Sequence, residues 1–360
     1  MNIFLYVSIA IIIGLLSTRL MKLIKLPNVT GYLLTGIIIG PSVLGLFFNG
    51  FDFNNSFKTG SLVYDFVTSL SWISVLALGF IAFTIGNNFR IDTIKKLGKR
   101  FIIITLFEAL GAAIFVFVGL MIAHFIEGAI VGYDNQTITW PLILTLSAIS
   151  CATAPAATLL VIRQYKARGP LVSTLLPVVA LDDAVALIAF SILFGIARTI
   201  QTGGDTNVGI LVAKPLLEIV LSLVIGAAFG FIISYLCKLF KSRANRTILC
   251  IFAIAANIGI YYLFGAYELG PLCKLELSYL LMCMMTSMVF INMRKSDSDR
   301  TFERIDLITP IVFMLFFIFS GANLNITIFA SKQVGILLII ALTYLIFRII
   351  GKYLGAYTST

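Results

Sequence analysis

The chain has 360 residues, of which 60% are hydrophobic and only 12% are charged, and its mean hydropathy is +1.05. A soluble globular domain carries about one-quarter charged residues, so this composition excludes water as the main solvent. The net charge of +10 does not indicate nucleic acid, because the basic residues stand in short loops between apolar segments and not in one stripe or tail. We expect no nucleic-acid partner.

Eleven apolar segments are long enough to cross a membrane, since a spanning helix needs about 20 mainly apolar residues. They lie near 3–25, 29–48, 63–88, 101–126, 140–163, 170–197, 208–240, 246–264, 275–293, 307–328 and 333–356. No basic n-region precedes the first segment, so it should be retained as a helix and not cleaved. The five cysteines show no CxxC pairing and are interpreted as packing residues. We expect one all-α membrane domain over residues 1–360.

Loop charges predict the orientation of these spans, because short cytoplasmic loops collect Lys and Arg. One set of alternate loops, near 19–25, 90–100, 163–168, 238–246 and 294–304, holds 19 of the 26 basic residues. The opposite loops hold only five, among them Lys58 and Lys332. The N-terminus should therefore lie outside a multi-pass protein of the cell membrane.

Two short patterns recur in the two halves of the chain. The segment 31–36 (GYLLTG) resembles 278–283 (SYLLMC), and 86–91 (GNNFRI) resembles 321–326 (GANLNI). The matches pair the second span with the ninth and the third with the tenth, which run in opposite directions, as in inverted-repeat transporters. We expect a first repeat over about 29–197 and an incomplete second repeat over about 275–360. The two helices that would complete the second repeat are absent, which predicts a chain truncated before them.

Asp182 and Asp183 stand almost at the midpoint of the 170–197 span. A carboxylate at the bilayer centre costs roughly 2.5–3.5 kcal/mol on insertion scales, so a charge there indicates function by default. Two adjacent carboxyls do not ionise together readily, and their oxygens bind both protons and hard cations. The pair can therefore exchange protons for a cation. The alternative is that Pro177 breaks this span and the aspartates cap a second helix.

The preceding span, 140–163, is small, hydroxylated and interrupted by proline at membrane depth, with Ser150, Thr153 and Pro155 at its centre. A helix that unwinds there presents backbone carbonyls and dipole ends to ions, as broken helices in transporters do. The alternative is a proline kink packed on small residues. If the helix breaks, Ser150, Thr153 and Pro155 line the ion site.

Several other polar residues in the spans have no motif of their own. Glu108 and Glu218 are further acidic candidates, for which helix-bundle salt bridges are an equal explanation. Arg348 and Lys352 lie near a cytoplasmic end and could be ordinary anchors. His124, the only histidine, is at an outer helix end, which favours an interfacial role over proton relay.

The chain resembles the bacterial cation:proton antiporters of the NapA/KefB-like group along essentially its whole length. The resemblance rests on five motifs in the family's order, namely 31–42 (GYLLTGIIIGPS), 79–86 (GFIAFTIG), 152–157 (ATAPAA), Asp182-Asp183 and Gly351-Lys352. It implies an NhaA-like fold with a dimerisation domain beside a core domain, in which broken helices cross near the aspartates. It also implies a homodimer in the bilayer and no cofactor.

By matching positions, the resemblance implies that Asp183 is the main carboxylate for the cation and the proton, with Asp182 as its partner. Thr153 would line the first broken helix, and Lys352 would pair with Asp182. The double aspartate with that lysine looks like the electrogenic subgroup. The implied substrates are protons and a monovalent cation (Na⁺, K⁺ or Li⁺), with Asp183 and Asp182 as cation ligands.

Other function classes fit less well. A sodium-coupled symporter of organic anions with a similar fold is the alternative, although its core would not need adjacent aspartates. A channel would need a carbonyl-filter signature, which the sequence lacks. An enzyme is the least favoured class, because the sequence offers no Ser/His/Asp set, metal-ligand cluster or phosphate-binding glycine loop.

Overall fold

The computed structural model of the protein describes residues 3–48, 50, 53–87, 89–92, 100–131, 137–202, 208–240, 242–266, 277–326 and 334–359. In these ranges all the regular structure is helical, as the sequence predicts. The helices are α1 (Ile3–Leu23), α2 (Asn28–Ile39), α3 (Leu44–Phe48), α4 (Phe53–Ser56), α5 (Leu62–Ser69), α6 (Ser71–Gly86), α8 (Arg100–Val131), α9 (Trp140–Cys151), α10 (Pro155–Gln164), α11 (Pro170–Thr202), α12 (Val208–Leu239), α13 (Arg243–Ala266), α14 (Tyr279–Met293), α15 (Lys295–Ala322) and α16 (Val334–Ser359).

Each of the eleven predicted spans coincides with one helix or with two short ones. Eight stretches of the described chain are long and apolar enough to cross a membrane, and shorter apolar helices account for the rest. The largest error in the bounds concerns the predicted span 307–328. Its helix, α15, begins twelve residues earlier at Lys295 and ends at Ala322, because the charged segment before the apolar run continues the helix. Hydropathy locates apolar runs and does not detect polar helical extensions.

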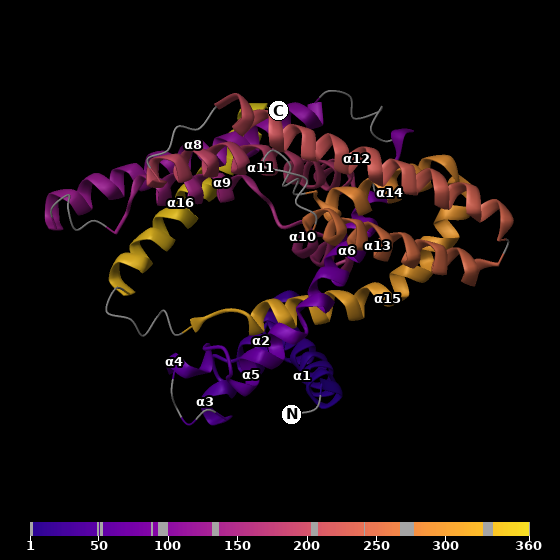
Figure 1. The fold of residues 1–360 in the computed structure, drawn as a ribbon, viewed down its shortest axis with the longest axis horizontal. Helices are drawn as coiled ribbons and strands as arrows, with labels where there is room; N and C mark the ends of the chain where they lie inside the picture. Colours follow the sequence, from indigo (N-terminus) through magenta and orange to yellow (C-terminus); the bar gives the residue numbers. More distant parts are fainter. Residues whose placement is uncertain are drawn as a thin grey trace.

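The long helices form two bundles, seen side by side in Figure 1. We call α8, α9, α11 and α16 the site bundle, since these four helices pack on one another. The scaffold bundle contains α1, α2, α6, α12, α13, α14 and α15, which also pack among themselves. Helix α10 is in sequence the continuation of α9, but it contacts α2 and α6 of the scaffold bundle as well as α11 of the site bundle. Helix α10 therefore lies between the two bundles.

The scaffold bundle contains the helices that the sequence repeat relates. The repeat relates α2 to α14 and α6 to α15. Helix α2 packs on α15, and α14 packs on α6, so the two contacts are equivalent under the repeat. Both contacts are made through glycine. A Cβ at Gly321 would overlap the backbone of Leu33, and a Cβ at Gly86 would overlap the backbone of Met284. Only glycine allows backbones to approach this closely. The repeat boundaries themselves stay a prediction.

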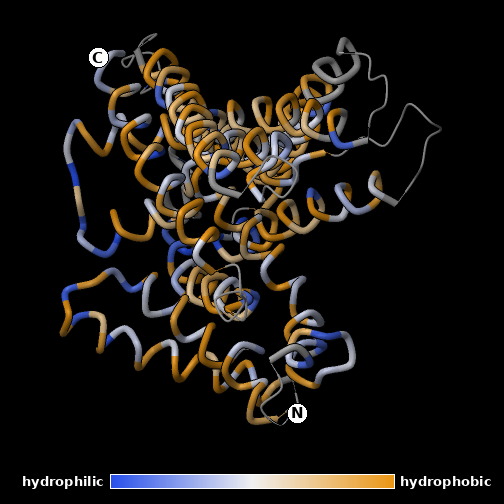
Figure 2. The backbone as a smooth tube through the Cα atoms, turned by 90° about the vertical axis from the view of Figure 1, so that its left-hand side faces the viewer, coloured by the Kyte–Doolittle hydropathy of each residue, from blue (hydrophilic) through white to orange (hydrophobic). Residues whose placement is uncertain are grey.

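Most residues of the helices are hydrophobic, as the orange colour along much of the tube in Figure 2 shows, and many of the large ones are exposed. Large exposed side chains include Leu106, Ile114, Val224 and Ile346. So many exposed apolar groups are unfavourable in water and are expected in lipid. Four of the five cysteines are buried and form no disulfide within the described residues, consistent with packing, and Cys273 lies outside those residues. The structure therefore agrees with a multi-span membrane protein.

The interfacial role that the sequence predicts for His124 stays a prediction. His124 is buried near the end of α8, and its ring Nδ1 lies 2.6 Å from the carbonyl oxygen of Ile138. One turn later, Glu127 accepts hydrogen bonds from the backbone N–H groups of Thr137 and Ile138, each at 2.9 Å. The two side chains hold the segment before α9 against α8, which positions the first half of the broken helix.

Candidate functional site

The 140–163 span is broken, and is not merely kinked. Helix α9 ends at Cys151 and α10 begins at Pro155. Between them Ala152 (φ −66°, ψ 142°) and Ala154 (φ −72°, ψ 99°) are extended. Proline lacks an N–H donor and disfavours helical geometry in the residue before it, so Pro155 can start α10 but cannot continue α9. The last carbonyls of α9 are therefore left without helical partners.

Helix α11 passes this break without interruption. It runs from Pro170 to Thr202 through Pro177 and position 182, so the reading in which Pro177 divides the span and the aspartates cap a second helix is wrong. Asp182 is fully buried, with 0% of its surface exposed. Its Oδ2 accepts a hydrogen bond from the Thr153 hydroxyl at the break. Its Oδ1 has no hydrogen-bond partner among the described residues.

A buried carboxylate oxygen without a donor is costly, because an unsatisfied charged group loses its hydration and gains nothing in return. Such an oxygen is available to accept from a proton donor or to bind a cation. The side chain of Asp183, the adjacent predicted ligand, lies outside the part of the chain that the structure describes, as does that of Pro155.

Lys352 of α16 reaches into the break. Its ammonium group donates to the Thr153 Oγ1 at 2.6 Å and to the Cys151 carbonyl at 3.0 Å. It lies 3.3 Å from Oδ2 of Asp182 and 3.0 Å from Oε1 of Glu108. The lysine is therefore not a cytoplasmic anchor. It joins the aspartate, the broken helix and a carboxylate of α8.

Arg348, one turn before Lys352, binds carbonyl groups at the C-terminal end of α9. Its Nε donates to the Ser150 carbonyl at 3.2 Å, and its Nη2 donates to the Ala152 carbonyl at 2.5 Å. These are orphan carbonyls at the negative end of a helix dipole, where a cation is stabilising. The anchor reading of Arg348 is also wrong, since its guanidinium fixes the broken backbone.

The structure thus brings together four of the predicted site residues, although it does not test their roles. Asp182, Thr153 and Lys352 share hydrogen bonds, and Ser150 contributes its carbonyl, while its hydroxyl donates to the Ser147 carbonyl at 2.6 Å. Sequence reasoning left Glu108 undecided, and the structure places it at the site. Glu218 is on α12 of the scaffold bundle.

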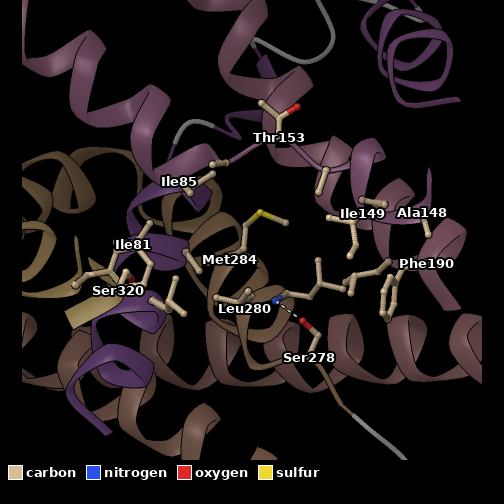
Figure 3. Close-up of a pocket in the computed structure, with 18 of the residues that line it drawn as sticks. Ile81, Ile85, Ala148, Ile149, Thr153, Phe190, Ser278, Leu280, Met284 and Ser320 are labelled. Atoms are coloured by element: carbon tan, nitrogen blue, oxygen red, sulfur yellow. Dashed lines mark hydrogen bonds between the residues drawn. The ribbon is translucent and has the colours of Figure 1, made fainter. Parts of the chain in front are cut away.

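A cavity of about 710 Å³ lies between the two bundles, next to the break (Figure 3). Ala148, Ile149 and Thr153 face it from the site bundle, and Ile81, Met284 and Ser320 face it from the scaffold bundle. Arg348 and Tyr344 also line it. The cavity reaches Thr153, so the break borders a space that is lined mostly by apolar side chains.

Helix α10 is held on the scaffold bundle at its far end. Leu159 is buried in the scaffold's apolar core with Tyr32 and Phe313. The side-chain oxygen of Gln164 accepts from the backbone N–H of Asn28 at 2.9 Å, and Arg163 pairs with Asp306 at 2.9 Å. Helix α10 therefore connects the scaffold bundle to the site bundle, whose helix α11 it also contacts.

The family model described as "Sodium/hydrogen exchanger, transmembrane" matches residues 7–359. The chain belongs to the sodium/hydrogen exchanger family. Membership indicates a membrane transporter and not an enzyme, with sodium ions and protons as the transported species. No curated protein sequence matches the chain.

The solved structures that are similar to the chain include two of one antiporter. One is that of the sodium proton antiporter MjNhaP1 from Methanocaldococcus jannaschii at pH 8, with a TM-score of 0.67 and 18% identity, covering 98% of this chain and 78% of that one. The other is an electron-microscopy map of the same antiporter, with a TM-score of 0.62 and 18% identity, covering 89% and 70%. At this identity the likeness concerns the fold alone, and it confirms the predicted antiporter fold.

Proposed function

We propose that the chain exchanges a monovalent cation, Na⁺ or K⁺, for protons across the cell membrane by alternating access, and that Asp183 and Asp182 form the shared site. The observation that carries this proposal is the fully buried Asp182 carboxylate, whose Oδ1 has no partner within the described residues although it lies beside a helix break. A hard cation takes oxygen ligands, and the break supplies carboxylate, hydroxyl and carbonyl oxygens.

Competition at one site explains the coupling. A proton and a cation each neutralise the same carboxylate pair, so only one of them is bound at a time. A buried carboxylate without either is costly to move through a low-dielectric interior. Rearrangement of the bundles is therefore favourable only when the site is occupied, which prevents leakage of either ion. The homodimer and the outside position of the N-terminus stay predictions.

The test is sodium- and potassium-driven proton movement in proteoliposomes, followed with an internal pH dye. Asp183→Asn keeps the size of the side chain and removes its charge, so we expect insertion to be unchanged and exchange to be lost. Asp65→Asn is the matched control, because Asp65 is an exposed aspartate whose side chain accepts a hydrogen bond only from the nearby Gly60 amide among the described contacts.

Exchange by Asp183→Asn at the control rate would show that this carboxylate does not carry the ion. Sodium-driven uptake of an organic anion without proton movement would instead indicate the symporter.

A further inference from the structure

The ammonium group of Lys352 lies closer to Glu108 than to Asp182, at 3.0 Å against 3.3 Å. Nothing in the proposed exchange cycle uses Glu108. Its side chain is 16% exposed, as is that of Lys352, so both groups are largely removed from solvent. Charges with so little hydration interact strongly with each other.

The backbones of α8 and α16 fix this pair in place. A Cβ at Gly351 would lie 2.7 Å from the carbonyl oxygen of Gly111, and a Cβ at Gly111 would lie 2.8 Å from the carbonyl oxygen of Gly351. A Cβ at Gly355 would lie 2.9 Å from the Cα of Glu108. The two helices therefore touch directly on both sides of Lys352. Glu108 is held beside the lysine by the packing itself.

Glu108 determines whether the break carries a net negative charge. Among the described side chains there, Lys352 and Arg348 are positive and Glu108 and Asp182 are negative. The net charge is zero, and an ionised Asp183 leaves one negative charge for one monovalent cation. Without Glu108 the same site would have no net negative charge, and Lys352 would have Asp182 as its only anionic partner among these groups.

We propose that Glu108 is a positioning residue that acts through Lys352. Its carboxylate neutralises the lysine and draws it from Asp182, which keeps the aspartate pair available to the cation. This inference rests on the proposed function, because it assigns a determinant of cation affinity at that site. Glu108 itself does not contact the ion.

The experiment measures the KM for sodium and the maximal rate of sodium-driven proton movement in proteoliposomes. In Glu108→Gln we expect the KM to rise about tenfold, since the coupling energies of close charge pairs at desolvated sites correspond to changes in affinity of about tenfold or more. The maximal rate should change less than threefold. Glu303→Gln, which alters an exposed glutamate on α15, is the control and should keep the wild-type KM.

A double-mutant cycle separates this role from a direct one. In a Lys352→Met background, Glu108→Gln should change the KM less than threefold, because the lysine that it neutralises is gone. An equal rise in both backgrounds would mean that Glu108 acts on the cation directly, and it would overturn the proposal. An unchanged KM in Glu108→Gln would do the same.

A conservative variant covers the case in which Glu108→Gln does not fold. Glu108→Asp keeps the charge on a shorter side chain, so we expect a KM within threefold of wild type, and a tenfold rise would contradict the inference. If wild-type protein shows no exchange, the proposed function fails and this inference fails with it. If wild-type protein exchanges and the Glu108 variants behave like the control, only the inference fails.

Discussion

The contact between α8 and α16 predicts a large effect of one methyl group at Gly351. In Gly351→Ala the new Cβ would lie 2.7 Å from the Gly111 carbonyl oxygen and 2.9 Å from the Cα of Ala112. Close C···O contacts in proteins are about 3.3–3.6 Å, so the helices must separate by about 0.6 Å or more. Overpacking of this kind typically costs about 1–3 kcal/mol. The separation also lengthens the contacts of Lys352 with Glu108.

The matched control is Gly259→Ala, because Gly259 is exposed inside α13 and a Cβ there meets nothing within 4 Å. Both variants gain the same helix propensity, about 0.5–1 kcal/mol. The difference between their stabilities therefore measures the effect of the close helix contact. We expect Gly351→Ala to have a melting temperature several degrees below that of Gly259→Ala in detergent, and slower sodium-driven proton movement. Equal melting temperatures and equal exchange rates would refute the close-packing argument.

Two further predictions follow from the site and from the loop charges. Arg348→Lys keeps the charge but cannot bridge the Ser150 and Ala152 carbonyls, so we expect it to destabilise the protein by about 1–3 kcal/mol and to slow exchange. A melting temperature and an exchange rate equal to those of wild type would contradict the role of the guanidinium. For the orientation, single cysteines replacing Lys96 and Lys332 should react with an impermeant reagent from the cytoplasm and from outside, respectively. Reaction of both from the same side would rule the topology out.

The sequence alone was sufficient for the fold class and for the location of the spans, because lipid demands long apolar helices whatever the tertiary packing. It also placed a break in the stretch that contains Ser150, Thr153 and Pro155, since a proline among small hydroxylated residues allows a helix to unwind at membrane depth, although a proline kink was the alternative. The bounds of α15 were less predictable. Charged residues before Thr301 are compatible with a helix that extends out of the membrane, and hydropathy does not predict whether such a segment is helical.

The contacts at the site were only partly predictable. Asp182 and Lys352 were paired through the resemblance to a family, not from their positions 170 residues apart in the sequence. Glu108 had no motif, and only the packing of α8 on α16 reveals its partner. The signal that could have found it is the spacing Gly351–Gly355 around Lys352, which is typical of close helix contacts and requires a small-residue partner such as Gly111. Arg348 was missed for another reason, since positive residues near cytoplasmic helix ends are common.

The extended link between α9 and α10 limits how far the end of α9 can move from the scaffold bundle. An uninterrupted helix would hold the Cα atoms of Cys151 and Pro155 about 6 Å apart. A fully extended chain over the same four steps reaches about 14 Å. While α10 keeps its contacts through Leu159, Gln164 and Arg163, the scaffold and the end of α9 can therefore separate by at most about 8 Å beyond helical spacing. A larger separation of the end of α9 from the scaffold bundle would require α10 to lose these contacts.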